Sequence, residues 1–187
     1  MWVHPLTKID PAEKKLAGIA KKIAALEKQA RTVRVRAPRK RVADYELTRA
    51  DGGLVKLSAL FEGKDQLVLI HNMGKSCPYC TMWADGFNAL WKKVAEKAAF
   101  VVVNNDVPDE QARVAAARGW SFPMVSARGT TLFRDLGFAD AKGDWYPGAS
   151  TLVRKKNGTI ERYAGVPFGP GDKFNSVFSF FELLPKT

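Results

Sequence analysis

The sequence of 187 residues lacks three features that would each define a class of protein. It has no run of about 18 consecutive apolar residues, which a membrane-spanning helix needs. Its first ten residues, MWVHPLTKID, lack the apolar segment of a secretory signal peptide. It has only two cysteines, too few for the disulfide framework of a small secreted domain. We therefore expect a cytoplasmic protein, with no membrane partner, whose main domain is large enough for a hydrophobic core.

Acidic side chains are scarce in the N-terminal arm. Residues 1–42 carry twelve Lys and Arg against three Asp and Glu, whereas residues 43–187 carry eighteen against sixteen. The arm also has no aromatic residue between Val3 and Tyr45. Sites for single-stranded nucleic acids combine basic residues with stacking aromatics, so we do not expect the arm to bind nucleic acid. We predict two parts: a basic helix and linker over 1–42, and a domain over 43–187.

The arm contains the signals of a helix. Asp10 is a candidate N-cap, Pro11 stands at the first helical position, and Glu13 completes a capping box. Apolar residues then recur at helical spacing, namely Leu16, Ile19, Ala20, Ile23, Leu26 and Ala30. Such a stripe needs a cover, which its own domain, a second copy in a homodimer or a membrane surface would provide. The next stretch, RTVRVRAPRKRVADY, is broken by Pro38 and is predicted to be an extended connector.

Strands and helices alternate through the rest of the chain. DYELTRADGGLVKLSALF is predicted to form a hairpin that turns at Asp51–Gly53. QLVLIHNM, AAFVVVNN and WSFPMVS are predicted strands, and STLVRKKNGTIERYAG a second hairpin. The predicted helices are TMWADGFNALWKKVAEK, VPDEQARVAAARG, TTLFRDLGF and the closing DKFNSVFSFFELL. This order predicts an α/β fold, a mixed sheet with helices on both faces.

The two cysteines lie in HNMGKSCPYCTMW, where a predicted buried strand gives way to a helix. Cys77 and Cys80, three residues apart in a first helical turn, face the same way. The unpaired N–H groups and the dipole of a helix N-terminus stabilise an anion, and Lys75 adds positive charge, so we predict a thiolate on Cys77. Pro78 limits the freedom of the pair. In the predicted mechanism Cys77 attacks a disulfide and Cys80 resolves the mixed disulfide.

Other roles for these residues remain open. A structural zinc would need about four ligands, and only two histidines are available to join the cysteines, so no metal or cofactor is predicted. Two inert buried thiols are a further alternative. Tyr79 is a candidate for an exposed substrate contact. His71 is predicted to be a hydrogen-bonded histidine at a strand end, and Asp85 an exposed helical acid.

These features resemble the thioredoxin superfamily, in which a CPYC-type motif follows a central strand and precedes a helix. Residues from about 10 to 184 are more similar to a bacterial family of thioredoxin-like proteins, related to the alkyl hydroperoxide reductase and thiol-specific antioxidant group. The resemblance is carried by DYELTRADGG, LSALFEGKDQLVLIHNM, CPYCTMWADGFN, FVVVNN and RGWSFPMVSARGTTLFRDLG. It implies a thioredoxin-like fold in its peroxiredoxin-like variant, preceded by the N-terminal helical arm.

The resemblance also implies a residue opposite the cysteines, where thioredoxins have a cis-proline. Pro123 lies about the right interval after Cys77 for a thioredoxin. A peroxiredoxin-like alignment puts Ser150 there instead and makes FPMVS an edge strand, where a proline is tolerated. We favour the second alignment because it gives residues 126–149 regular structure rather than a long loop. The predicted substrate-binding residues are thus Tyr79, Pro78, Ser150 and Pro123.

Peroxiredoxins carry a proline seven residues before and a threonine or serine three residues before the attacking cysteine, and an arginine on the facing strand. Before Cys77 these positions hold Ile70 and Gly74; before Cys80 they hold Met73 and Cys77. The facing segment YPGASTL has no arginine. We therefore predict a thiol–disulfide oxidoreductase for protein or low-molecular-weight disulfides. A thiol peroxidase that uses the same cysteines and a non-catalytic interaction module are the alternatives.

Overall fold

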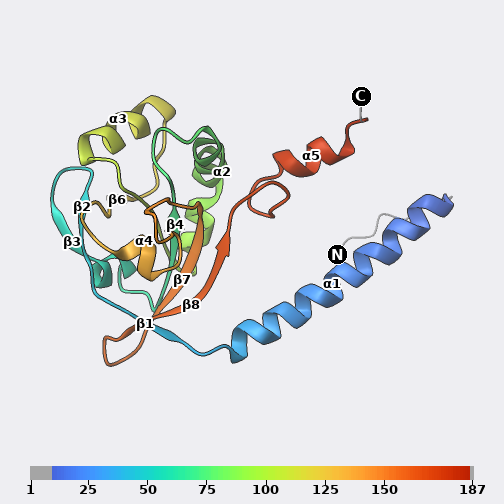
Figure 1. Cartoon of the computed structure of the whole chain (residues 1–187), viewed down its shortest axis with the longest axis horizontal. Coiled ribbons are helices and arrows are strands. Elements are labelled where there is room, and N and C mark those ends of the chain that lie inside the picture. Colours follow the sequence, from blue (N-terminus) through green and yellow to red (C-terminus); the bar gives the residue numbers. More distant parts are fainter. Residues whose placement is uncertain (1–9, 186–187) are drawn as a thin grey trace. The chain divides into compact units, whose positions relative to one another are not determined.

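The structure, a computed structural model, describes residues 10–185 and divides into two compact units, residues 1–38 and 39–187. The helix α1 (Pro11–Arg36) belongs to the first unit (Figure 1). Asp10 and Glu13 form the predicted capping box, and the Asp10 carboxylate accepts the N–H of Ala12 at 2.9 Å. Residues 1–9 of the predicted arm lie outside the described residues.

The prediction of an extended connector after residue 30 is wrong in two places. First, α1 continues through Arg36, because neither proline nor glycine interrupts residues 31–37. It ends where Ala37 takes an extended conformation, as a residue before proline prefers. Second, β1 (Lys40–Val42) is a strand, antiparallel to the C-terminal part of the sheet.

The second unit is built on an eight-stranded mixed sheet. Across the sheet lie β1, β8 (Ile160–Pro167), β7 (Gly148–Arg154), β4 (Gln66–His71), β5 (Ala99–Asn104), β6 (Met124–Ser126), β2 (Glu46–Arg49) and β3 (Leu54–Lys56). The pairs β4–β5 and β5–β6 are parallel, and the other neighbours are antiparallel. The predicted mixed α/β sheet is therefore confirmed. The prediction that FPMVS is an edge strand is wrong, because β2 pairs with the outer side of β6.

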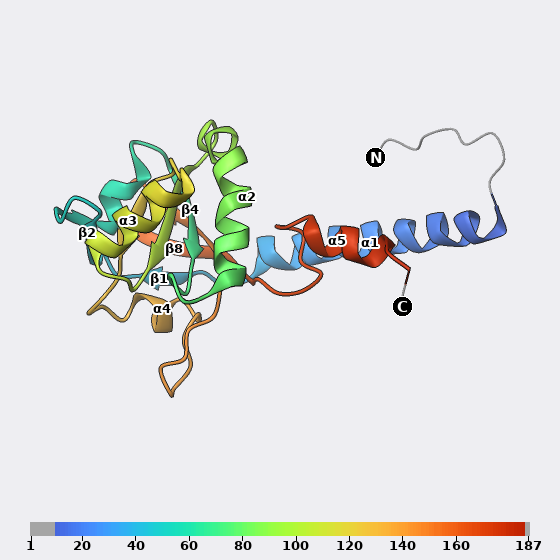
Figure 2. The same cartoon turned by 90° about the horizontal axis from the view of Figure 1, so that it is seen from above.

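Helices cover both faces of this sheet, as predicted (Figure 2). The helices α2 (Pro78–Ala95) and α3 (Pro108–Arg118) lie on one face. The short 3₁₀ helix η1 (Leu57–Phe61) and the helix α4 (Leu132–Asp135) pack on the other. The chain closes with α5 (Val177–Leu183). The structure thus has the predicted thioredoxin-like architecture, with the N-terminal helix in addition.

Each face of the sheet has its own hydrophobic core. On the α2 face, Trp83 and Phe87 of the helix pack against Phe100 and Val102 of β5. On the other face, residues of η1 and α4 pack against Leu67 and other inward residues of the central strands. All six residues of β5 are buried, which is why this strand reads as an unbroken apolar run. The α2 core fixes the helix that begins at the cysteines.

Candidate active site

Cys77 is the N-cap residue of α2. Its backbone is extended, and its sulfur accepts the backbone N–H of Cys80 at 3.1 Å. Pro78 follows at the first helical position, where its missing N–H leaves no bond unmade. The residue Cys77 is half-buried, whereas its neighbours Pro78 and Tyr79 are exposed. An N–H donor at the positive end of an eighteen-residue helix favours a negative charge on this sulfur.

Cys80 lies one turn deeper and is only 2% exposed. Its sulfur accepts the backbone N–H of Met73 at 3.4 Å, and its carbonyl accepts the Asn72 side chain at 3.4 Å. The loop between β4 and α2 therefore closes over this residue. Burial, and to a lesser extent a hydrogen bond with Cys77, raise the pKa of the Cys80 thiol to about 12. Cys80 is thus a neutral thiol throughout the physiological pH range.

The two cysteines therefore differ in exposure and in the hydrogen bonds that their sulfurs accept. Both are free thiols, and a side-chain hydrogen bond joins them. Cys77 is the more exposed residue and so the better placed for attack, whereas the buried Cys80 is placed to react with a partner already attached to Cys77. Such a pair is suited to attack by Cys77 on a substrate, followed by formation of a disulfide between Cys77 and Cys80.

The predicted substrate contacts separate into two groups. Pro78 and Tyr79 are exposed next to Cys77, and the Tyr79 side chain is 61% exposed. Ser150 is 1% exposed, and its hydroxyl bonds to His71 Nε2 at 2.9 Å, on the face of the sheet opposite α2. Pro123 precedes β6, which β5 separates from β4. Ser150 therefore does not present its hydroxyl to the cysteines.

His71 is a buried strand residue, as predicted. Its ring stacks on Phe138 at 3.9 Å between ring centroids, and its Nε2 bonds to Ser150. Burial, and to a lesser extent the positive charge of Arg162, lower the pKa of His71 to about 3. The imidazole is therefore neutral at physiological pH. It lies on the face away from α2, so it is not a base for Cys77.

Two charged side chains near α2 have structural partners. Lys75 Nζ pairs with Glu110 of α3 at 3.0 Å, so its charge is shared with a carboxylate and not directed at Cys77 alone as predicted. Asp85, predicted as an exposed acid, accepts the Trp120 indole N–H at 2.8 Å and pairs with Arg118. Partial burial raises the pKa of Asp85, but these bonds outweigh it and lower the pKa overall. Asp85 joins α2 to the segment after α3.

Sequence reasoning missed a polar network that holds the loop before Cys77. Asp106, after β5, accepts the backbone N–H of Lys75 at 2.9 Å and the Asn104 side chain at 3.1 Å. Gly74 has a φ of +91°, and a Cβ there would collide with the Asp106 carboxylate. The glycine in HNMG was the available signal, because it marks a turn directly after a buried strand.

Residues 10–185 contain neither a cluster of metal ligands nor a membrane-spanning helix. No three side chains of His, Cys, Asp or Glu in this range gather closely enough to hold a metal ion. None of the helices in this range has the length and apolarity to span a bilayer.

Comparison with known proteins agrees with this architecture. Peroxiredoxin Q, chloroplastic, from Gentiana triflora is 27% identical over 140 residues, which are 74% of this chain and 63% of that protein. Peroxidoxin BcpB from Mycobacterium tuberculosis has 22% identity and a TM-score of 0.56, over 79% of this chain and 97% of that one. Peroxiredoxin Q from Xanthomonas campestris has 22% identity and a TM-score of 0.57, over 75% and 90%. The two solved structures support a shared fold.

The family is given by a match over the central part of the chain. The profile of the AhpC/TSA family matches residues 38–163, which include the sheet from β1 to the start of β8 and both cysteines. The predicted relation to the alkyl hydroperoxide reductase and thiol-specific antioxidant group is therefore confirmed. Because the match covers more than half of the chain, this protein belongs to the AhpC/TSA family.

Proposed function

We propose that the protein is a thiol peroxidase of the peroxiredoxin Q type. Family membership and the relative named peroxiredoxin Q favour this alternative over the broader prediction of a disulfide oxidoreductase. One observation carries the chemistry: the half-buried Cys77 sulfur accepts the Cys80 N–H at a helix N-terminus, with a second thiol beside it. Cys77 is the attacking residue and Cys80 the resolving residue.

The proposed cycle uses both sulfurs. The Cys77 thiolate attacks one oxygen of a hydroperoxide, the O–O bond breaks, and Cys77 becomes a sulfenic acid. The other oxygen leaves as an alkoxide or hydroxide and takes a proton from water. The Cys80 thiol then attacks the Cys77 sulfur, a disulfide forms, and the sulfenic oxygen leaves as water with the thiol proton. An external dithiol supplies two electrons and restores both thiols. We place this cycle in the cytoplasm, where such reductants are maintained.

The site lacks two groups that peroxiredoxins use to polarise a peroxide. Gly74 occupies the position of the hydroxyl residue before Cys77, and residues 148–151 of β7 include no arginine. The arginine of this strand, Arg154, donates to the carbonyls of Ser58 and Lys64 instead. The Cys80 N–H and the N-terminus of α2 are the remaining electrostatic support for the attacking sulfur. We therefore expect a slower peroxidase than one with both groups.

A second candidate function is dithiol–disulfide exchange with protein or low-molecular-weight disulfides. The exposed Pro78 and Tyr79 next to Cys77 favour it, because they provide an open surface on which a protein disulfide can dock. The same two sulfurs would serve: Cys77 would form the mixed disulfide, and Cys80 would release the product. The predicted non-catalytic role is the remaining alternative.

One comparison of substrates separates these functions. The reduced protein is given hydrogen peroxide, cumene hydroperoxide or an insulin disulfide, each with the same dithiol reductant in excess. We expect Cys77-dependent consumption of both peroxides and little reduction of insulin. Reduction of insulin without peroxide consumption would establish dithiol exchange instead. A protein that is inactive towards all three would contradict both enzymatic proposals and leave the interaction module.

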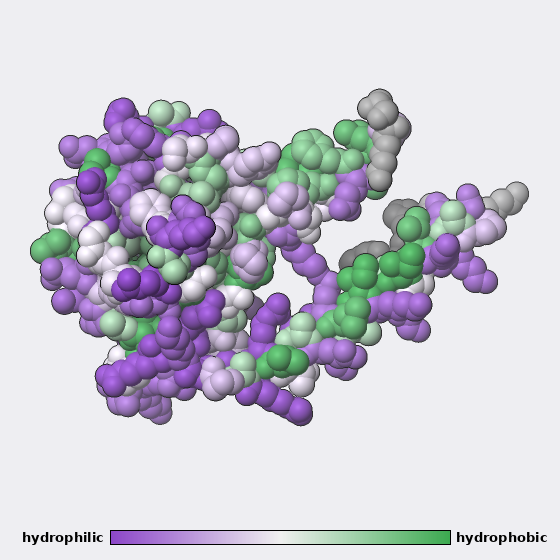
Figure 3. All heavy atoms as spheres, viewed as in Figure 1, coloured by the Kyte–Doolittle hydropathy of each residue, from purple (hydrophilic) through white to green (hydrophobic). Residues whose placement is uncertain are grey.

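We further propose that α1 pairs with a second copy of the chain. Its apolar residues follow a 3–4 spacing at both seam positions of a heptad repeat: Leu16, Ile23 and Ala30 at one, and Ile19, Leu26 and Val33 at the other. No residue of α1 is buried, and hydrophobic residues follow the helix along its length (Figure 3). Two apolar positions per heptad are typical of a coiled-coil seam rather than of a wider membrane-facing surface. Lys22 and Glu27 flank the seam where a parallel partner would pair them.

Sedimentation velocity tests this pairing. We expect the wild-type chain to sediment as a dimer at micromolar concentration. Ile23→Asp puts a charge in the seam and is expected to weaken dimerisation at least about tenfold, because an unpaired buried carboxylate costs more than about 1.4 kcal/mol. Ala25→Asp puts the same charge outside the seam and serves as the control. A monomeric wild type, or equal behaviour of the two variants, would contradict the proposal.

A further inference from the structure

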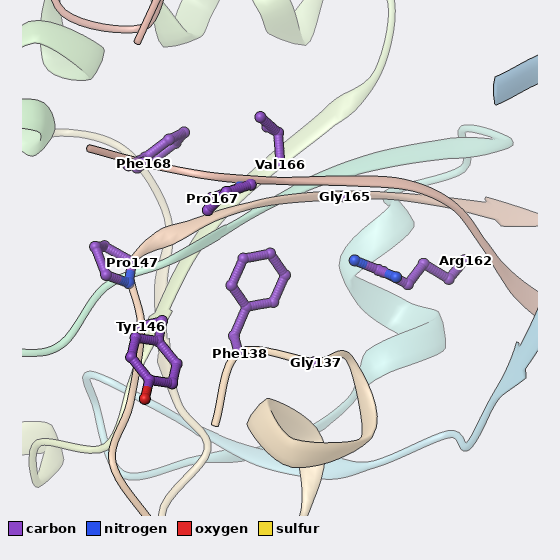
Figure 4. Close-up of a pocket in the computed structure, with 9 residues that line it drawn as sticks. All are labelled: Gly137, Phe138, Tyr146, Pro147, Arg162, Gly165, Val166, Pro167 and Phe168. Atoms are coloured by element: carbon purple, nitrogen blue, oxygen red, sulfur yellow. The ribbon is translucent and has the colours of Figure 1, made fainter. Parts of the chain in front are cut away.

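A pocket of about 280 Å³ lies at one end of strands β7 and β8, next to the loop that follows α4 (Figure 4). Its wall includes backbone of β8 and one charged side chain, that of Arg162. The side chains that form the rest of the wall are aromatic or apolar, and they are Phe138, Tyr146, Pro147, Val166, Pro167 and Phe168. The pocket is thus apolar at one end and cationic at the other.

Arg162 has no anionic partner among residues 10–185. Its Nε is buried and makes no hydrogen bond, and no carboxylate in this range forms an ion pair with it. Its guanidinium lies 5.8 Å from the ring centroid of Phe138, towards which it points in Figure 4. Burial lowers the pKa of Arg162, but a guanidinium stays charged in proteins. A partly buried positive charge therefore lacks the hydrogen bonds that such groups normally make.

Two glycines make room for this arrangement. A Cβ on Gly165 would overlap the Arg162 guanidinium, and a Cβ on Gly148 would overlap the Phe138 ring. The pairing of β7 with β8 shifts register at Thr151 and Leu152, directly opposite Arg162. This irregularity lets Arg162 turn along the sheet towards the pocket. The backbone thus accommodates the arginine and the ring side by side.

Other groups near the pocket do not supply a negative charge at the arginine end. His71 stacks on Phe138 and is neutral, since burial holds its pKa at about 3. The Tyr146 hydroxyl donates to Asp140 at 3.0 Å, so that carboxylate lies on the far side of the tyrosine ring. Glu161, next to Arg162 in the chain, pairs with Lys155 at 3.1 Å. Arg162 therefore sets the sign of the charge in the pocket.

We propose that this pocket binds a small carboxylate that carries an apolar, ring-sized body. The planar guanidinium matches a carboxylate with two parallel hydrogen bonds, which would satisfy its unpaired N–H groups. The aromatic and proline side chains would enclose the apolar part of the ligand. The volume lies just below the usual range for small-molecule sites, about 300–1,000 Å³, so the ligand is a small acid. This site is separate from the proposed reaction at Cys77.

Benzoate is a suitable probe, and benzamide is its uncharged counterpart of the same shape. Binding is followed in the full-length, reduced protein by two-dimensional NMR of the amide signals. We expect benzoate to shift the signals of Phe138, Tyr146 and Gly165 in a saturable manner. We expect benzamide and inorganic phosphate to bind at least about tenfold more weakly than benzoate. Benzamide lacks the negative charge that pairs with Arg162, and phosphate lacks the ring that contacts the apolar wall.

The control variants separate the pocket from general charge effects. Arg162→Gln is expected to weaken benzoate binding at least about tenfold, and Arg162→Lys to restore part of it, since lysine keeps the charge but not the planar fork. Arg49→Gln removes an exposed arginine on β2 and should leave binding unchanged. Equal binding of benzoate and benzamide, or unchanged binding in a folded Arg162→Gln variant, would overturn the proposal. So would the absence of any saturable benzoate shift.

Discussion

Replacing Cys77 with serine is expected to lower the rate of peroxide consumption by about a thousandfold or more. Serine has nearly the same shape, and its oxygen can accept the Cys80 N–H, so α2 should still begin at residue 77. Cys80 cannot replace the missing sulfur, because it is buried and its pKa is about 12. It stays a neutral thiol at neutral pH, and the thiolate is the reactive form. Stopped-flow measurement of peroxide loss gives the rate.

The matched variant is Cys80→Ser, which keeps the attacking sulfur and removes the resolving one. We expect it to complete one turnover at a rate close to that of the wild type and then stop with Cys77 as a sulfenic acid. Mass spectrometry after dimedone labelling would detect that product. If Cys80→Ser lost the first turnover and Cys77→Ser retained it, the roles of the two sulfurs would be reversed.

Truncating Trp83 to alanine is expected to destabilise the protein by about 3–5 kcal/mol. The indole is 4% exposed and packs on Phe168 and Phe178, with ring centroids 5.4 and 6.0 Å away. Trp83 also lies one turn after Cys80, so it anchors the start of the helix that carries both sulfurs. Urea unfolding, followed by circular dichroism, measures the loss. A loss below about 1 kcal/mol would mean that this cluster does not hold α2.

Trp83→Phe provides the control. The indole Nε1 of Trp83 is buried and has no hydrogen-bond partner. Phenylalanine removes this unsatisfied N–H, which favours the folded state. Its smaller ring keeps most, but not all, of the contacts with Phe168, and the lost contacts disfavour the folded state. We expect a net change within about 1 kcal/mol of the wild type. A loss as large as that of the alanine variant would indicate a hydrogen bond to the indole that the packing does not reveal.

Elements with strong local signals could be predicted from the sequence. The helix α3 has Pro108 at its start and ends at Gly119, which has a φ of +67°. The strand β5 is an unbroken apolar run because helices cover one of its faces and η1 the other. The helical state of residues 31–36 could not be predicted, because a basic stretch with Arg31, Arg34 and Arg36 is as typical of a solvated linker as of a helix. β1 depends on its pairing with β8 much later in the chain, which no local pattern encodes.

The site could be predicted only in part, for a related reason. The spacing of Cys77 and Cys80, and their place before a helix, follow from short-range patterns. The face of the sheet on which Ser150 lies does not follow from such patterns, because it depends on the register between β4 and β7. Ser150 pairs with Leu69, which points away from α2, whereas its neighbour Ala149 pairs with Ile70 on the α2 face. A shift of one residue in the register would have put the hydroxyl on the other face.

The two edge strands of the sheet affect whether another chain can bind by adding a strand to it. β1 and β3 are three residues long, and they carry Lys40, Arg41 and Lys56. Short, charged margins of this kind discourage a foreign peptide from adding itself as a further strand. Both edges of the sheet therefore disfavour recognition by strand addition and association of sheet with sheet. Helices and loops offer the other surfaces for contacts with partner molecules.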